Sequence, residues 1–503
     1  MRPLKRAGRH LPPKLYSTAD AHEWPKDNFF FFSEAKELSP ENGIRGTLFW
    51  MGRRKNRRAK QESARPFVAE TEVELAPLAV AVAELAVAEE RVVASLEPVP
   101  VVVVARREAD RPLAEGVLNA ASGRRALGGF FLSGLLFSFL GSFLPAWGYH
   151  LRSDYLTVGL YFLFLNFGVY VAFHLTQLLL PRRGIRFVLA LGSAMAVGAL
   201  IYLATLSGPV PPSLRMAGLF VVGMSAAMVN TAIFHAITPM YEHDPAATIN
   251  LAGVFFGLGC FATSGVIAAA FTRYTASAIL VIIACVPLFY LLSWLRAAPM
   301  ALARTELPSL RVAMKDFRSP GAVLFTLLLF FQFGNEWAIA GWLPLFLVQR
   351  LGASPTTGIG LLCWYFLALL VGRIVAQALL RRMKHSRLLL FSVLAAFFGS
   401  LLLSLTATID GAFVAVLLLG AGFAAIYPLT AESIEHRFQS YHPGFYNGIF
   451  SLGLTGALLA PTVLGVAAQY WGIGSVMWLP LVGSIAVFVL VLAIWLEARL
   501  TGR

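Results

Sequence analysis

Residues 330–350 read F-F-Q-F-G-N-E-W-A-I-A-G-W-L-P-L-F-L-V-Q-R. The stretch is long and apolar enough to cross a bilayer, which takes about 20 residues, yet it carries Gln332, Asn335 and Glu336. Of the ten acidic side chains that follow residue 126, only Glu336 lies in the middle of an expected span. A charge at mid-bilayer costs roughly 2.5–3.5 kcal/mol even on the mildest scale, so such residues usually face a bundle interior or a wet cavity. Glu336 is therefore predicted to face such a space.

The composition is that of a polytopic membrane protein. The chain has 503 residues, of which 57% are hydrophobic and only 14% charged, and its mean hydropathy is +0.69. This is too apolar for a soluble domain and too long for one buried core. The three cysteines lie within apolar stretches without C-x-x-C spacing, which indicates packing residues rather than disulfides or metal ligands.

Residues 1–125 differ from the rest of the chain. Basic runs with Pro and Gly are followed by low-complexity Val/Ala/Glu/Pro sequence, and no apolar run reaches spanning length. This composition predicts a disordered cytosolic tail without chemistry. The alternative is a basic segment that touches anionic lipid. Met51 is an alternative start of the chain.

From residue 126 onward, apolar runs of about twenty residues recur between short polar breaks, as a bilayer requires. They predict twelve transmembrane helices, six in residues 126–296 and six in residues 321–503, joined by a cytosolic linker over 297–320. Alternate loops hold thirteen Lys and Arg side chains, against four in the opposite loops. The positive-inside rule then places both termini in the cytosol, and we expect the protein in the cell (inner) membrane. The expected spans are 128–149, 156–179, 187–207, 215–238, 247–271, 276–295, 321–349, 357–380, 388–408, 412–434, 444–469 and 474–496.

The two sets of helices are related to each other in sequence. At an offset of 199, Leu144-Pro145 falls on Leu343-Pro344, and at an offset of 197, Asn250 falls on Asn447. Two matching six-helix halves joined by a cytosolic loop are typical of secondary transporters, whose site lies near the midplane between the halves.

Several motifs resemble one transporter family. The Asn335-Glu336 pair followed by G-W-L-P over 341–344, then Gly372-Arg373, resembles the seventh and eighth helices of the fucose/galactose-type sugar:proton symporter branch of the major facilitator superfamily. So does the fifth-helix stretch I-N-L-A-G-V-F-F-G-L-G over 249–259. The resemblance covers about residues 126–500. It implies an all-α major facilitator fold and a monomeric transporter that moves a sugar or related small polar metabolite with protons by alternating access, without a cofactor.

The residues of the seventh span suggest the site. On a helix Gln332, Asn335 and Glu336 share one face, while Trp337 and Trp342 supply flat apolar walls. Sugars suit such a surface because their hydroxyls need donors and acceptors and their C–H faces stack on rings. A carboxyl that faces a cavity can accept and release a proton during transport, so Glu336 is the candidate for proton coupling. Symporters of this branch resemble one another in carrying acids in the first and fourth helices, and this chain has none there. The alternative is a purely structural hydrogen bond across helices.

Other polar residues within spans are assigned to the pocket or to gating. The weaker pocket candidates are Asn230, Asn166 and Tyr427. The gating or structural candidates are His174 and Arg373, which correspond through the repeat, and the matched pair Asn250 and Asn447. For Arg373 we expect helix locking or a side chain extended toward the interface, and for the asparagines a clamp at the cytosolic gate.

Other classes of function lack their motifs. Glu432 and His436 have i, i+4 spacing, but no H-E-x-x-H motif supports a metal site. The chain also lacks a phosphate-binding G-x-x-x-x-G-K-[ST] loop and a G-x-S-x-G elbow. We therefore expect neither an enzyme nor a nucleic-acid-binding protein. The remaining alternatives are an exporter of amphipathic compounds and a transporter-like sensor that moves no solute.

Overall fold

The computed structural model describes residues 113–206, 208–243, 245–297, 317, 319–380, 382–438 and 448–500, with side chains described from residue 126 and outside 239–247. The predictions for most of the N-terminal tail, for most of the linker over 297–320 and for Asn447 therefore lie outside the described residues.

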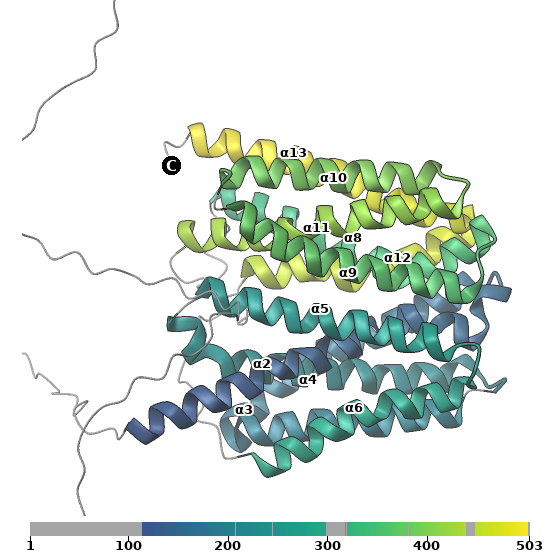
Figure 1. Cartoon of the computed structure of the whole chain (residues 1–503), viewed down its shortest axis with the longest axis horizontal. Coiled ribbons are helices and arrows are strands. Elements are labelled where there is room, and N and C mark those ends of the chain that lie inside the picture. The colour runs from purple at the N-terminus through teal and green to yellow at the C-terminus, as the bar shows by residue number, and fades with distance from the viewer. Residues whose placement is uncertain are drawn as a thin grey trace, which may run out of the picture. The chain divides into compact units, whose positions relative to one another are not determined.

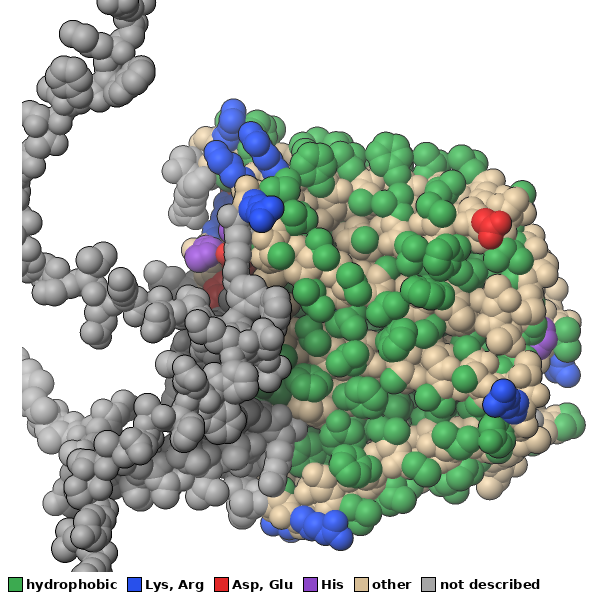
Figure 2. All heavy atoms as spheres, viewed as in Figure 1, with side chains coloured by type: hydrophobic (Ala, Val, Ile, Leu, Met, Phe, Trp, Pro, Cys, Tyr) green, Lys and Arg blue, Asp and Glu red, His purple; other side chains and the backbone are tan. Residues whose placement is uncertain are grey.

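Within these ranges the fold is all-α, and eleven helices are long and apolar enough to cross a membrane. They run side by side, with α2–α6 and α8–α13 forming two groups (Figure 1). Hydrophobic side chains cover the middle of the visible face, and most charged ones lie toward its two ends (Figure 2). The helices are α2 (Leu113–Phe143), α3 (Tyr155–Thr205), α4 (Pro212–His243), α5 (Pro245–Ala270), α6 (Ala276–Arg296), α8 (Pro320–Leu351), α9 (Pro355–Leu380), α10 (His385–Leu405), α11 (Ile409–Arg437), α12 (Gly448–Trp471) and α13 (Trp478–Leu500), with short 3-10 turns η1 (Leu144–Trp147), η2 (Tyr149–Leu151) and η4 (Ile473–Met477).

Helix α2 starts earlier than predicted. The expected tail extends to residue 125, but the helix begins at Leu113. The helical backbone therefore starts before the first expected span, which begins at residue 128.

Helix α3 combines the second and third predicted spans, so the expected count of twelve separate helices differs from the eleven found in the described ranges. It has 51 residues, about 77 Å at 1.5 Å per residue, more than twice the apolar thickness of a bilayer. It is interrupted at Gly184, whose φ of 79° and ψ of 166° are not helical. Glycine takes this left-handed φ without steric cost, and Pro181 just before it weakens the helix further.

Contacts with α4 show that α3 folds back at this point. A methyl group at Gly168 would overlap the Phe220 carbonyl of α4, while Leu203 lies against Gly218, only two residues from Phe220. Gly168 and Leu203 would be about 52 Å apart on a straight helix. Since both lie against the same short stretch of α4, the two parts of α3 form a helical hairpin.

Local sequence explains where several helices begin and end. Asp154 accepts a hydrogen bond from the Thr157 backbone N–H at 3.2 Å and caps α3, and Thr408 caps α11 in the same way. Helix α8 begins with Pro320 in its first turn and ends at Gly352, where φ is 67°.

Helices approach one another closely where glycines meet backbone. A side chain at Gly456 of α12 would overlap the carbonyl of Phe330 in α8, and one at Gly134 of α2 would overlap the carbonyl of Phe256 in α5. Small residues at such crossings allow the van der Waals packing that holds helices together in lipid.

Gly456→Ala is therefore expected to destabilise the helical bundle by about 1–3 kcal/mol, because the added methyl forces α12 away from α8. The control is Gly198→Ala, since a methyl group at Gly198 would meet nothing within 4 Å and alanine is the better helix former. Reversible unfolding in detergent would measure both. Equal stability of the two variants would contradict the close approach.

Candidate functional site

A small cavity lies between the two groups of helices. It has a volume of about 30 Å³ and is lined by residues of α5, α8 and α9. Four of its walls are aromatic, contributed by Phe256, Trp337, Tyr365 and Phe366, and its two charged side chains are Glu336 and Arg373. Helix α5 comes from the N-terminal half and α8 and α9 from the C-terminal half, so both halves contribute to this cavity.

Glu336 is held from its own helix. Gln332 Nε2 donates to Glu336 Oε1 at 2.7 Å, one helical turn away. Glu336 is half-buried and lines the cavity. By contrast, Glu497 at the end of α13 pairs directly with Arg437. Glu336 thus has an amide partner but no ion pair within the described part of the chain.

Arg373 reaches across to the other half of the protein. Its Nη1 donates to the backbone carbonyl of Gly253 in α5 at 3.1 Å, and its Nε is buried without a partner. It lines the same cavity as Glu336 and attracts that carboxylate electrostatically. The sequence suggested helix locking or extension toward the interface; the structure has a bond between the halves and a guanidinium at the cavity.

Asn335 departs from the predicted face. It is fully buried, and a side chain at Gly483 of α13 would overlap its amide group. Asn335 therefore points into the C-terminal half, away from the cavity that Glu336 lines. The predicted face splits because residues 335 and 336 are 100° apart around the helix.

The two tryptophans also separate. Trp337 lines the cavity and packs against Phe137 of α2, with ring centroids 5.6 Å apart. Trp342 is fully buried elsewhere, where its Nε1 donates to the Pro461 carbonyl at 2.9 Å and its ring lies beside Phe162. Trp337 fits the predicted wall, whereas Trp342 joins α8 to α3 and α12.

The three weaker pocket candidates lie outside the cavity lining. Asn166 Nδ2 donates to the Leu458 carbonyl at 2.6 Å, which joins α3 to α12. Asn230 accepts from Ser133 Oγ at 2.9 Å, within the N-terminal half. Tyr427 packs against Phe333 within the C-terminal half.

Of the remaining gating candidates, Asn250 joins the two halves. Its Nδ2 donates to Gln377 Oε1 in α9 at 2.5 Å. His174 is exposed and lies between the rings of Tyr170 and Phe173.

A second set of contacts joins the halves near the α3 N-terminus. Gln349 Nε2 lies within hydrogen-bonding distance of three carbonyls around η2, the nearest being that of Arg152 at 2.9 Å. Gly159 and Gly465 bring α3 and α12 together so closely that a Cβ on Gly465 would lie 2.5 Å from the Gly159 Cα. The sequence did not identify this contact, because a glutamine at a helix end carries no signal of its partner.

Cys260 and Tyr365 were also missed as cavity residues. A helical pattern was available for part of this lining, since Phe366, Leu369 and Arg373 follow i, i+3, i+7 spacing on α9.

A larger hollow of about 460 Å³ lies among α2, α5 and α6. Its lining is apolar apart from Cys285 and Tyr290 and contains no charged side chain. It lacks the groups that bind a polar solute, so the smaller cavity is the better candidate site.

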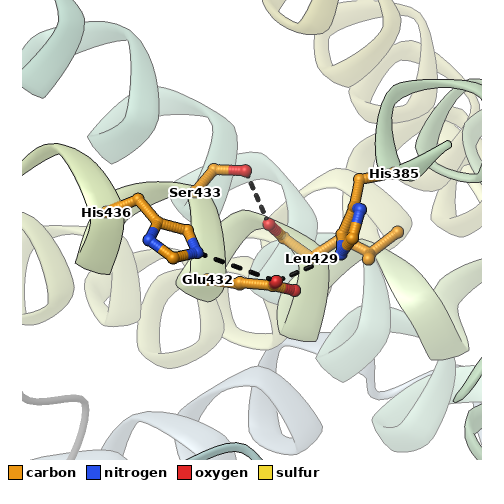
Figure 3. Close-up of polar contacts among 5 residues, drawn as sticks. All are labelled: His385, Leu429, Glu432, Ser433 and His436. Atoms are coloured by element: carbon orange, nitrogen blue, oxygen red, sulfur yellow. Dashed lines mark hydrogen bonds and ion pairs between the residues drawn. The ribbon is translucent and has the colours of Figure 1, made fainter. Parts of the chain in front are cut away.

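The Glu432 cluster, considered above for metal binding, connects α10 to α11 (Figure 3). Glu432 Oε1 lies 3.1 Å from His385 Nε2 and 3.9 Å from His436 Nε2. All three side chains are substantially exposed. Where side chains are described, no group of three or more His, Cys, Asp or Glu residues, this one included, is placed so that it could hold a metal ion.

Comparison with known proteins identifies the fold. The family model of the Major Facilitator Superfamily matches residues 232–455, and the match to a transporter family confirms the prediction that the chain is not an enzyme. A nucleoside transporter, NupG, matches with a TM-score of 0.57 and 14% identity, over 76% of this chain and 98% of that one.

Two sugar symporters have the same fold. The E. coli fucose:proton symporter FucP matches with a TM-score of 0.52 and 15% identity, over 75% of this chain and 99% of that one. A D-xylose-proton symporter matches with a TM-score of 0.59 and 13% identity, over 74% and 96%. No curated protein sequence matches the chain. The described helices have the major facilitator fold, and they are those of a multi-pass membrane protein.

Proposed function

We propose that this protein moves a small polar solute, a sugar or related metabolite, across the membrane together with protons. The observation that carries the proposal is the Glu336 carboxyl in a cavity to which both halves contribute. A carboxyl in such a place is suited to take up a proton on one side and release it on the other. Trp337 supplies the flat wall for a sugar face. With the α3 hairpin counted as two crossings, the chain would cross the membrane twelve times. It would act as a monomer in the cell (inner) membrane, with both termini in the cytosol.

The size of the cavity supports alternating access. Its volume of about 30 Å³ is room for one or two waters, whereas small-molecule sites have about 300–1,000 Å³. A solute would enter only after the halves move apart. The Asn250–Gln377 hydrogen bond and the contacts of Gln349 join the two halves, so we expect such a movement to break them.

The structural relatives support this choice of solute. Their names describe transport of nucleosides, fucose with protons and D-xylose with protons. At these sequence identities the similarity supports only a shared fold. The proposal therefore rests on the cavity, and the relatives serve only to choose the first compounds to test.

Uptake into proteoliposomes tests the proposal. Vesicles holding the purified full chain would be offered radiolabelled hexoses, pentoses and nucleosides, with and without an imposed pH gradient. We expect at least one compound to accumulate against its gradient, and a proton ionophore to abolish the accumulation. If every compound enters no faster than into protein-free vesicles, the proposal is wrong.

The aromatic lining favours a second candidate, an exporter of amphipathic compounds. Four rings surround the cavity, and aromatic faces also bind flat cations. The same vesicles loaded with amphipathic cations would discriminate, since an exporter would release them when a pH gradient is imposed.

A transporter-like sensor is the remaining alternative from the sequence. Removal of residues 1–112 leaves α2 intact and distinguishes the two classes. A transporter core is expected to retain uptake at close to the full rate, measured in the same vesicles. Loss of every response to solute after this deletion, with the core still folded, would favour the sensor.

A further inference from the structure

The cavity contains one acid and one base. The charged or titratable groups around it are Glu336 of α8, Arg373 and Tyr365 of α9, and Cys260 of α5. Arg373 stays cationic at all ordinary pH values, so the net charge of the site depends on Glu336. With Glu336 ionised the two charges balance, and with Glu336 protonated the site carries one positive charge.

That positive charge is costly within the membrane. An unpaired charge removed from water costs several kcal/mol, and a partner of opposite charge offsets much of this. If Glu336 binds a proton as proposed, Arg373 loses its counter-charge at that step. A solute with one negative charge restores the balance. When Glu336 is ionised, the same solute would be repelled by the carboxylate.

Unused hydrogen-bond donors lie at the same place. Arg373 Nε is buried without a partner, and one of its terminal nitrogens bonds to the Gly253 carbonyl. Tyr365 is 1% exposed, lines the cavity and has no partner for its hydroxyl. Buried donors without acceptors cost free energy, and a carboxylate supplies two oxygens that accept from such groups.

We infer that the transported solute is a small organic carboxylate, bound through its carboxylate to Arg373 and Tyr365 while Glu336 carries the proton. The inference rests on the proposed function and narrows its substrate class from polar metabolites to their anionic members. Proton and anion would cross together, so the loaded and empty sites have the same net charge.

Matched pairs of probes test this on the purified full chain. Gluconate is compared with glucose, and benzoate with benzamide, by thermal unfolding at mildly acidic and mildly alkaline pH, because a ligand of the folded state raises the midpoint. We expect at least one carboxylate to stabilise the protein at acidic pH, and its neutral counterpart not to. The inference would be overturned if the neutral member of a pair stabilised the protein as much as the carboxylate did. It would also be overturned if neither carboxylate stabilised the protein.

Three variants assign the effect to its residues. Arg373→Gln is expected to weaken carboxylate binding about 10- to 100-fold, the value of a charged hydrogen bond, and Arg373→Lys to retain part of it. Arg350→Gln is the matched control, because Arg350 is exposed on α8. Glu336→Gln keeps an oxygen that can accept the hydrogen bond from Gln332, so we expect it to fold. Its uncharged amide mimics the protonated acid, so the added carboxylate probe should bind to this variant at both pH values. Loss of binding at alkaline pH in Glu336→Gln would contradict the charge argument even if Arg373→Gln fails to fold.

The outcome separates this inference from the proposed function. Accumulation of a neutral sugar under a pH gradient, with no carboxylate bound, rejects the carboxylate and retains proton-coupled transport. Binding of a carboxylate through Arg373 with no compound transported rejects the transport proposal and retains the anion site.

Discussion

Glu336→Gln is expected to abolish accumulation of solute against its gradient while leaving exchange of solute across the membrane intact. A pH difference of one unit is worth about 1.4 kcal/mol per proton, or about tenfold accumulation. An amide neither takes up nor releases that proton, so the accumulation ratio should fall to that of passive equilibration. Exchange needs only binding and movement of the halves, which a glutamine next to Gln332 permits.

Both quantities can be measured on the same proteoliposomes. Uptake under a pH gradient measures accumulation, and counterflow without a gradient measures exchange. Asp410→Asn is the matched control, because Asp410 is exposed in the first turn of α11. Retained accumulation in Glu336→Gln would show that another group carries the proton. Loss of counterflow together with accumulation would instead indicate a structural role for Glu336.

Gly465→Ala is expected to shift the protein away from the state described by this structure. The new methyl would lie 2.5 Å from the Gly159 Cα in α3, closer than van der Waals contact, and such overpacking costs about 1–3 kcal/mol. The cost falls mainly on the state in which α3 and α12 touch, so its population relative to an open state should fall about 5- to 150-fold.

Distances between spin labels at Leu151 and Tyr470 would report this, because both residues are strongly exposed near the contact and lie in different halves. We expect a longer distance to become dominant in Gly465→Ala. Gly360→Ala is the control, since a methyl there meets nothing within 4 Å. A distance distribution identical in the two variants would show that this contact does not oppose opening.

The helices themselves follow from local sequence. Apolar runs of spanning length, broken by polar residues, predicted nearly all of them, because helical backbone satisfies its own polar groups in lipid. The α3 hairpin was predicted as two spans for the same reason, and only its assignment as one helix differs. A carboxyl in the middle of an apolar run was enough to predict that Glu336 lines a cavity, because exposing its charge to lipid is unfavourable.

The directions of side chains around each helix depended on tertiary packing. A helix that is apolar on every side gives no sequence signal for which face meets a neighbour, since lipid and protein interior are equally apolar. Asn335 was therefore grouped with Glu336 although it faces Gly483 of α13, and Arg373 was separated from Glu336 although both line one cavity. Sequence composition determined which segments cross the membrane and which residue is unusual within them. Packing of α8 against α9, and against α5 of the other half, decided which side chains line the cavity with Glu336, because these come from three separate helices.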